Sequence, residues 1–109
     1  MVKPVVGEVV ILDFPQTNLQ PGKRRPALVV ADITGDDLIL CQIKNQVRPD
    51  IYSVTLTAAD FERGALAVDR LARTNRLFTV EKSTILYSAA QVNAAKMAEV
   101  KAKLRQLFA

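Results

Sequence analysis

Three consecutive cations, Lys23-Arg24-Arg25, stand directly before Pro26 and an apolar run that continues to Val30. Proline fixes its own φ angle and favours an extended backbone in the residue before it. The apolar run after the proline is typical of a buried strand. We therefore expect Arg25 at the rigid start of a strand, where its planar guanidinium suits two oxygens of one phosphate. An ordinary solvated loop is an equal alternative, since short basic runs are common.

The residue types that are missing restrict the chemistry further. The chain has no histidine, one cysteine and no glycine-rich phosphate loop. Histidine is the usual proton shuttle at neutral pH and the commonest metal ligand, so we expect no metal and no cofactor. Catalysis would have to come from Arg, Lys, Asp, Glu, Thr, Ser or Tyr. Cys41 has apolar neighbours, which favours a place in the core over a role as a nucleophile.

Composition indicates a small basic domain. The 109 residues are 50% hydrophobic and 6% aromatic, which predicts one domain, residues 1–109, with an aliphatic core. A formal net charge of +4 biases the chain towards polyanions. There is no apolar run of about 18 residues, so we expect no transmembrane span, and Gly7 and Glu8 interrupt the first apolar stretch, which argues against a signal peptide. A single cysteine fits a reducing cytoplasm.

The apolar pattern predicts a series of short strands that would position these residues. We expect strands over residues 7–14, 26–32, 38–43, 52–56, 66–68, 76–80 and 84–87. Residues 15–25 and 44–51 form the polar loops. Thr57 and Asp60 predict a short capped helical turn that Gly64 ends.

A single amphipathic helix is expected at the C-terminal end of the chain. Ser88 would begin it, with Gln91 as its partner in a capping box. Its apolar stripe comprises Met97, Val100, Leu104, Leu107 and Phe108. We expect this stripe to cover a sheet, because the low aromatic content argues against a helix on a membrane surface. Short strands with one terminal helix predict a mainly β (α+β) fold built as a small, strongly bent barrel.

Five segments, taken in order, resemble the MazF/PemK/Kid toxin family of type II toxin–antitoxin systems. They run from Gly7 to Pro15, Lys23 to Val30, Leu40 to Ile43 and Asp69 to Thr74, followed by the Ser88 helix. The resemblance covers nearly the whole chain and implies an SH3-like barrel of the CcdB/PemK kind. It also implies a cytoplasmic homodimer that cleaves single-stranded RNA at specific sequences without a metal. The products would carry 2′,3′-cyclic phosphate and 5′-hydroxyl ends.

The family's essential arginine falls on Arg25. A fixed guanidinium stabilises the negative charge that builds on phosphate oxygens during attack. Guanidinium groups give up a proton with difficulty, so electrostatic stabilisation is the expected role. Many family members have threonine or serine after the third strand, where this chain has Lys44 and Asn45. Lys44 could supply charge there and Asn45 a hydrogen bond, or activity is weakened.

Other candidate residues surround this centre. Asp69 is a candidate base, although its alignment with the family needs a one-residue gap and a salt bridge to Arg70 or Arg73 is an equal alternative. We expect phosphate contacts from Lys23, Arg24, Arg48, Arg73 and Arg76, and base-edge contacts from Asn18 and Gln42. Phe14 and Tyr52 could stack a base, but we expect both in the core.

The resemblance also implies a partner, an antitoxin with an acidic, partly disordered tail that would contact Arg25 and Arg73. Two other functions stay open. A catalytically silent barrel could bind RNA or only the antitoxin, because Lys44 and Asn45 lack the usual hydroxyl. A gyrase poison of the CcdB kind would act by binding a protein, but that family ends its helix with a tryptophan and this chain has none.

Overall fold

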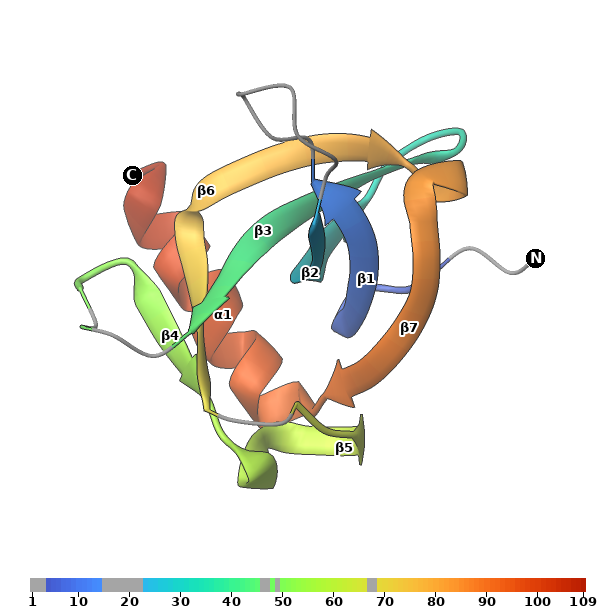
Figure 1. Ribbon diagram of the computed structural model, residues 1–109. Coiled ribbons are helices and arrows are strands. Elements are labelled where there is room, and N and C mark those ends of the chain that lie inside the picture. Colours follow the sequence, from blue (N-terminus) through green and yellow to red (C-terminus); the bar gives the residue numbers. More distant parts are fainter. Residues whose placement is uncertain (1–3, 15–22, 46–47, 49, 67–68) are drawn as a thin grey trace.

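The computed structural model describes residues 4–14, 23–45, 48, 50–66 and 69–109. Seven antiparallel strands form one bent sheet in the order β4-β6-β3-β2-β1-β7-β5, and one α-helix follows (Figure 1). The strands are β1 Glu8–Phe14, β2 Lys23–Asp32, β3 Asp37–Asn45, β4 Ser53–Leu56, β5 Phe61–Gly64, β6 Arg70–Glu81 and β7 Ile85–Val92, and the helix is α1 Ala94–Leu107. The predicted mainly β barrel with a C-terminal helix is confirmed as a half-barrel.

The central strands are buried on both faces of the sheet. The helix-side core comprises Val9, Leu28, Cys41, Ile43, Val54, Leu56, Ala72, Ala90, Val92, Met97 and Val100. The second core comprises Val10, Leu12, Ala27, Val29, Leu38, Leu40 and Ile85, with Phe78 and Val80 of β6 packed against it. Successive side chains of a strand point to opposite faces, so strands β1 to β3 contribute to both cores. This two-sided burial explains why their sequences are continuous apolar runs.

Strand β6 is longer than predicted. The sequence predicted a strand only over 76–80, but β6 begins at Arg70 and pairs with both β3 and β4. Arginines at positions 70 and 73 hide the strand pattern, because the buried residues between and after them are Leu71, Ala72 and Thr74. Of the predicted strand 66–68, only Leu66 is described, and it lies in no strand.

The predicted helix start is wrong. Ser88 lies in β7, where its hydroxyl donates to Glu8 Oε1 at 2.8 Å, and pairing with β1 and β5 extends β7 to Val92. Asn93 is the actual N-cap, and its Oδ1 accepts from the Lys96 N–H at 2.9 Å. Met97 and Val100 are buried as expected, whereas Phe108 is 73% exposed. No helix in the described residues has the length and apolar character needed to cross a membrane.

The predicted turn at Thr57 is confirmed. Asp60 Oδ2 accepts from the backbone N–H and the hydroxyl of Thr57, at 2.8 Å and 3.1 Å, and residues Ala58–Asp60 form a 3₁₀ turn. The edge strand β5, which follows at once and ends at Gly64, was not predicted. Its four residues alternate too briefly to be distinguished from a helical turn by sequence alone.

Strands β2 and β3 part before their ends, and this divergence prepares the candidate site. Their last paired residues at this end are Ala27 and Gln42. Beyond that point β2 stays paired with β1, while β3 stays paired with β6 as far as Asn45 and Arg70. The residue of β2 just before Ala27 is Pro26, which has no N–H group to donate to a neighbouring strand. We call this divergence the fork.

Candidate functional site

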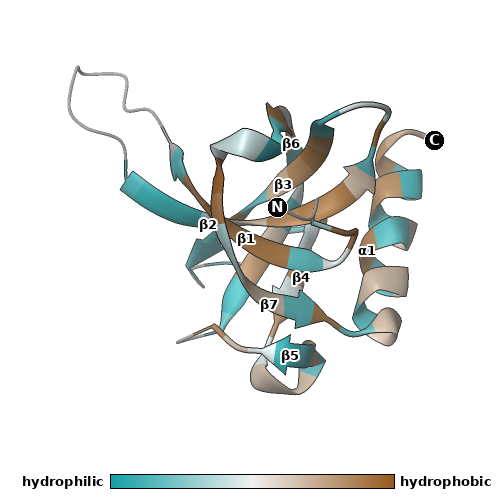
Figure 2. Ribbon diagram, turned by 90° about the vertical axis from the view of Figure 1, so that its right-hand side faces the viewer, coloured by the Kyte–Doolittle hydropathy of each residue, from teal (hydrophilic) through white to brown (hydrophobic). Residues whose placement is uncertain are grey.

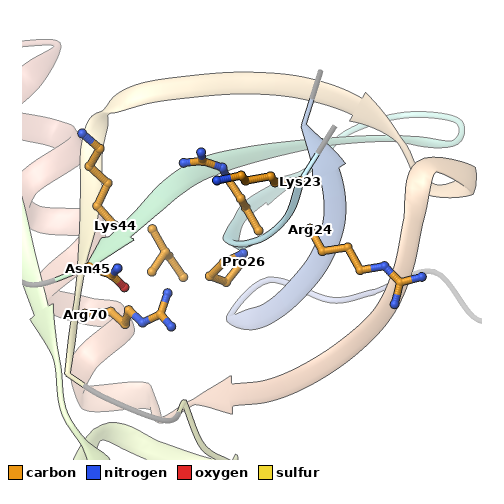
Figure 3. A pocket seen from close by; sticks show the side chains of 8 residues that line it. Lys23, Arg24, Pro26, Lys44, Asn45 and Arg70 are labelled. Atoms are coloured by element: carbon orange, nitrogen blue, oxygen red, sulfur yellow. The ribbon is translucent and has the colours of Figure 1, made fainter. Parts of the chain in front are cut away.

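A hollow of about 450 Å³ occupies the fork, and we call it the first hollow. Its lining consists of Lys23, Arg24, Arg25 and Pro26 from β2, Ile43, Lys44 and Asn45 from β3, and Arg70 from β6 (Figure 3). Five of these eight residues are cations and none is acidic. Figure 2 shows the hydrophilic start of β2 extending beyond the apolar body of the sheet. The first hollow therefore suits a ligand that carries several negative charges.

The cations of the first hollow have no acidic partners among the residues that the structure describes. Within the described part of the chain, no carboxylate lies within ion-pair distance of any of them. Figure 3 shows that they do not all converge, since Arg24 extends away from Pro26 and from the opposite wall. Asn45 and Arg70 lie side by side on that wall, as their pairing across β3 and β6 requires.

A second hollow of about 200 Å³ adjoins the first at the end of β3. It is lined by Lys44, Asn45, Arg48, Asp50, Ser53, Leu71 and Arg73. Lys44 and Asn45 line both hollows, so the end of β3 lies between them. Together the two hollows form a basic surface longer than one phosphate group needs.

Asp50 is the acidic residue that lines the second hollow. Its Oδ1 accepts from the Ser53 hydroxyl and from the Tyr52 N–H, both at 2.9 Å, and its Oδ2 lies 4.0 Å from the Arg73 guanidinium. The Ser53 hydrogen bond, the Tyr52 N–H and the charge of Arg73 lower the pKa of Asp50. Asp50 is therefore a weak base that shares Arg73 with any bound anion.

Buried Thr74 fixes the neighbouring backbone. Its hydroxyl donates to the Tyr52 carbonyl oxygen at 2.6 Å, and its N–H donates to the same oxygen at 3.2 Å. The Tyr52 side chain is 37% exposed, so the prediction that it packs in the core is wrong. The hydroxyl and the N–H of Thr74 thus both hold the Tyr52 carbonyl oxygen. The side chain of Phe14 lies outside the described residues.

The structure brings together most of the residues that the sequence singled out. Lys23, Arg24, Arg25, Lys44 and Asn45 line the first hollow, and Arg48 and Arg73 line the second. Half-buried Gln42 and the exposed Asp69 and Arg76 line neither hollow, and Asn18 lies outside the described residues. The register of β6 against β3 jumps from Arg73 opposite Gln42 to Leu77 opposite Cys41, which leaves Arg76 without a β3 partner. The roles assigned to all these residues stay predictions.

Sequence reasoning missed Arg70, Asp50 and Ser53. Arg70 was considered only as a partner of Asp69, but no ion pair joins them in the described residues, and Arg73 faces Asp50. The spacing of Asp50 and Ser53 is a local turn signal that could have been found. Arg70 could not have been found in this way, because its place depends on the pairing of β6 with β3.

Two observations concern other chemistry. Burial of Cys41 raises the pKa of its thiol to about 12, so the thiol stays protonated and the predicted core position is confirmed. No three His, Cys, Asp or Glu side chains come together among the residues that the structure describes.

Comparison with known proteins identifies the family. A family model described as PemK-like, MazF-like toxin of type II toxin–antitoxin system matches residues 6–108. A search of curated proteins finds no match. A chain of the crystallised MazE–MazF (Form-II) from Deinococcus radiodurans is 25% identical, with a TM-score of 0.79, covering 99% of this chain and 97% of that chain. MazF (Form-I) from the same organism is 26% identical, with a TM-score of 0.76 and coverage of 99% and 98%.

A more distant structure shares the fold. An endoribonuclease in complex with its cognate antitoxin, from a mycobacterial species, is 16% identical with a TM-score of 0.75. It covers 96% of this chain and 94% of that chain, which at this identity shows the fold alone. The family match spans nearly the whole described sheet and helix, including both walls of the fork. The chain therefore belongs to the PemK-like, MazF-like toxin family of type II toxin–antitoxin systems.

Proposed function

We propose that this toxin is an endoribonuclease that cleaves single-stranded RNA without a metal ion. The observation that carries the proposal is the first hollow, where the described lining residues include five cations and no acidic residue. Such a surface attracts a polyanion, and its position between two strands holds the cations on a rigid sheet. RNA is the polyanion that the resemblance to the MazF/PemK/Kid toxins implies, and membership of this toxin family supports that choice.

The proposed reaction is an internal transfer of the phosphate. The 2′-oxygen of one nucleotide attacks the adjacent phosphorus, the bond from phosphorus to the 5′-oxygen breaks, and a 2′,3′-cyclic phosphate forms. The 2′-hydroxyl loses its proton and the leaving 5′-oxygen gains one, so no water is consumed. Negative charge grows on the non-bridging oxygens, and cations fixed beforehand stabilise that charge more than they stabilise the substrate.

We assign the stabilising role to Arg25, with Lys44 adding charge and Asn45 a hydrogen bond. No carboxylate is among the described residues that line the first hollow, so a base such as Asp69 would have to act from outside it. Asp50, in the adjoining hollow, has a lowered pKa and is a weak proton acceptor. Electrostatic stabilisation is therefore the main contribution that we assign to the protein.

We further propose a cognate antitoxin as the protein partner. A segment rich in Asp and Glu would suit the same two hollows and would exclude RNA from them. The relatives support this idea, since one of the similar structures is a MazE–MazF assembly. We also propose that residues 1–109 form one toxin domain, and that the protein is a homodimer in the cytoplasm.

The test is cleavage of a long, mixed-sequence RNA in the presence of EDTA. Wild type should give fragments that end in cyclic phosphate. Arg25→Ala should slow cleavage about 100- to 1,000-fold, as the loss of one preorganised charge-stabilising group does elsewhere. Arg105→Ala, which removes an exposed cation from the last turn of α1, is the matched control and should cleave like wild type. Equal rates for both variants would refute the role of Arg25.

A catalytically silent RNA-binding barrel is the second candidate. None of the described residues lining the first hollow carries a hydroxyl, and Ser53 in the second hollow already donates to Asp50. The observation that would favour this candidate is RNA binding by wild type without cyclic-phosphate products. In that case Asn45→Thr should restore measurable cleavage, because it returns a hydroxyl to the end of β3.

A further inference from the structure

Among the cations that line the first hollow in the described residues, Arg70 alone has a paired strand on each side of its backbone. It is the first residue of β6, and its backbone lies between Asn45 of β3 and Leu56 of β4. Strands on both sides fix the direction in which its side chain leaves the sheet. Figure 3 shows that side chain next to Asn45, with its end directed towards Pro26 on the opposite wall.

The Arg70 side chain also has an unsatisfied donor. Its Nε atom is buried and has no hydrogen-bond partner among the residues that the structure describes. It is the one side-chain nitrogen or oxygen in that part of the chain in this condition. Because Nε is closed to solvent, a ligand would reach the guanidinium through its terminal nitrogen atoms, at the end of the side chain that Figure 3 shows directed towards Pro26.

Asn45 completes a small recognition surface beside Arg70. The two residues are direct partners across β3 and β6, so their side chains share one face of the sheet. The guanidinium offers a planar fork of donors, and the exposed carboxamide offers one donor group and one acceptor. Arg25 comes from the other wall of the fork, so arginines from both walls line the first hollow.

We propose that Arg70, assisted by Asn45, binds the nucleotide next to the one held by Arg25, through a pair of acceptor atoms lying in one plane. The inference rests on the proposed function, since it takes single-stranded RNA as the ligand. Two sources of such an acceptor pair exist in RNA: the non-bridging oxygens of a phosphate, and the O6 and N7 atoms of guanine. If guanine is the source, Arg70 contributes to the sequence preference of cleavage.

The probes are 2′-O-methyl oligouridines, which lack the attacking hydroxyl and cannot be cleaved. One probe contains uridine only, and each of the others carries a single guanosine at a different position. Affinities of wild type, Arg70→Gln and Arg105→Gln are measured by fluorescence anisotropy over a range of salt concentrations. Arg105 is exposed in the last turn of α1, so its replacement matches the charge loss away from the fork.

Arg70→Gln should weaken binding about 10- to 100-fold relative to Arg105→Gln, as expected for lost hydrogen bonds to a charged group. If the acceptor is a phosphate, all the probes weaken equally and the salt slope becomes shallower by about 0.7. If it is guanine, wild type prefers one guanosine position, and Arg70→Gln loses that preference at nearly constant salt slope. Affinities equal to those of Arg105→Gln on every probe would overturn the inference.

Two further variants protect the test against misfolding. Arg70→Lys keeps the charge and the aliphatic stem but loses the planar fork, so it should also weaken binding. Asn45→Ala changes only an exposed side chain and should weaken binding about 3- to 10-fold, the value of one ordinary hydrogen bond. Failure of the proposed enzyme is separable, because wild type that binds these probes but cleaves no RNA still reports on Arg70. Wild type that binds no probe would overturn both proposals.

Discussion

RNA binding by this toxin should weaken steeply as salt rises, with a slope set by the cations of the first hollow. Arg24 extends away from Pro26, so we do not count it as a phosphate contact. The four cations that we count are Lys23, Arg25, Lys44 and Arg70. Each phosphate neutralised on a single strand contributes about −0.7 to the slope of log affinity against log salt. Four such contacts, with Arg70 on a phosphate, predict a slope of about −2.8, or a loss of about 50-fold between about 50 mM and 200 mM salt, and three, with Arg70 on guanine, predict about −2.1.

The assay is fluorescence anisotropy with a 2′-O-methyl RNA, in which binding is separated from cleavage. Arg25→Gln should reduce the slope by about 0.7, so the same rise in salt would cost only about 20-fold in affinity. Arg105→Gln removes the same charge from α1 and should leave the slope unchanged. A wild-type slope shallower than about −1, or one that Arg25→Gln does not alter, would refute the assignment of the first hollow as the phosphate-binding surface.

Two other substitutions test the surroundings of the site. Asp50→Asn keeps a hydrogen-bond acceptor for the turn but removes the negative charge beside Arg73, so RNA affinity should rise about 2- to 5-fold. The control is Asp36→Asn, which removes a carboxylate near Lys82 and should change RNA affinity less. A fall in affinity for Asp50→Asn would contradict this reading. Gly64→Ala should destabilise the fold by about 2–4 kcal/mol in thermal or urea unfolding, because φ is +69° and a Cβ would meet the β7 backbone. Gly35→Ala has a similar φ of +83° but open space, so it should cost only about 1–2 kcal/mol, and equal losses would refute the steric argument.

The central strands could be predicted because their burial leaves a local signature. Continuous apolar runs in β1, β2 and β3 follow from contacts on both faces of the sheet. The helix start could not be placed from the sequence, since Ser88 and Gln91 match a capping box, whereas Asn93, the actual N-cap, has Lys96 three residues later and does not. What decides is the pairing of β7 with β1 and β5, which no local pattern contains.

The candidate site likewise contains some residues that the sequence could predict and others that it could not. Lys23, Arg24 and Arg25 are recognisable because their signal is contiguous and ends at Pro26. Arg70 reaches the same hollow only through the register of β6 against β3, where it lies opposite Asn45. Residues brought together by long-range pairing carry no signal in one sequence, so Lys44 and Asn45 of the second wall could be named as candidates but Arg70 could not.

The burial of β3 on both faces restricts which of its residues can change among related toxins. Its interior side chains serve both cores, with Leu38 and Leu40 in one and Cys41 and Ile43 in the other. Any change of size there disturbs packing on one side of the sheet or the other. Lys44 and Asn45, at the exposed end of the strand, carry no such constraint. Changes at this rim should therefore alter what the fork binds without disturbing the packing of either core.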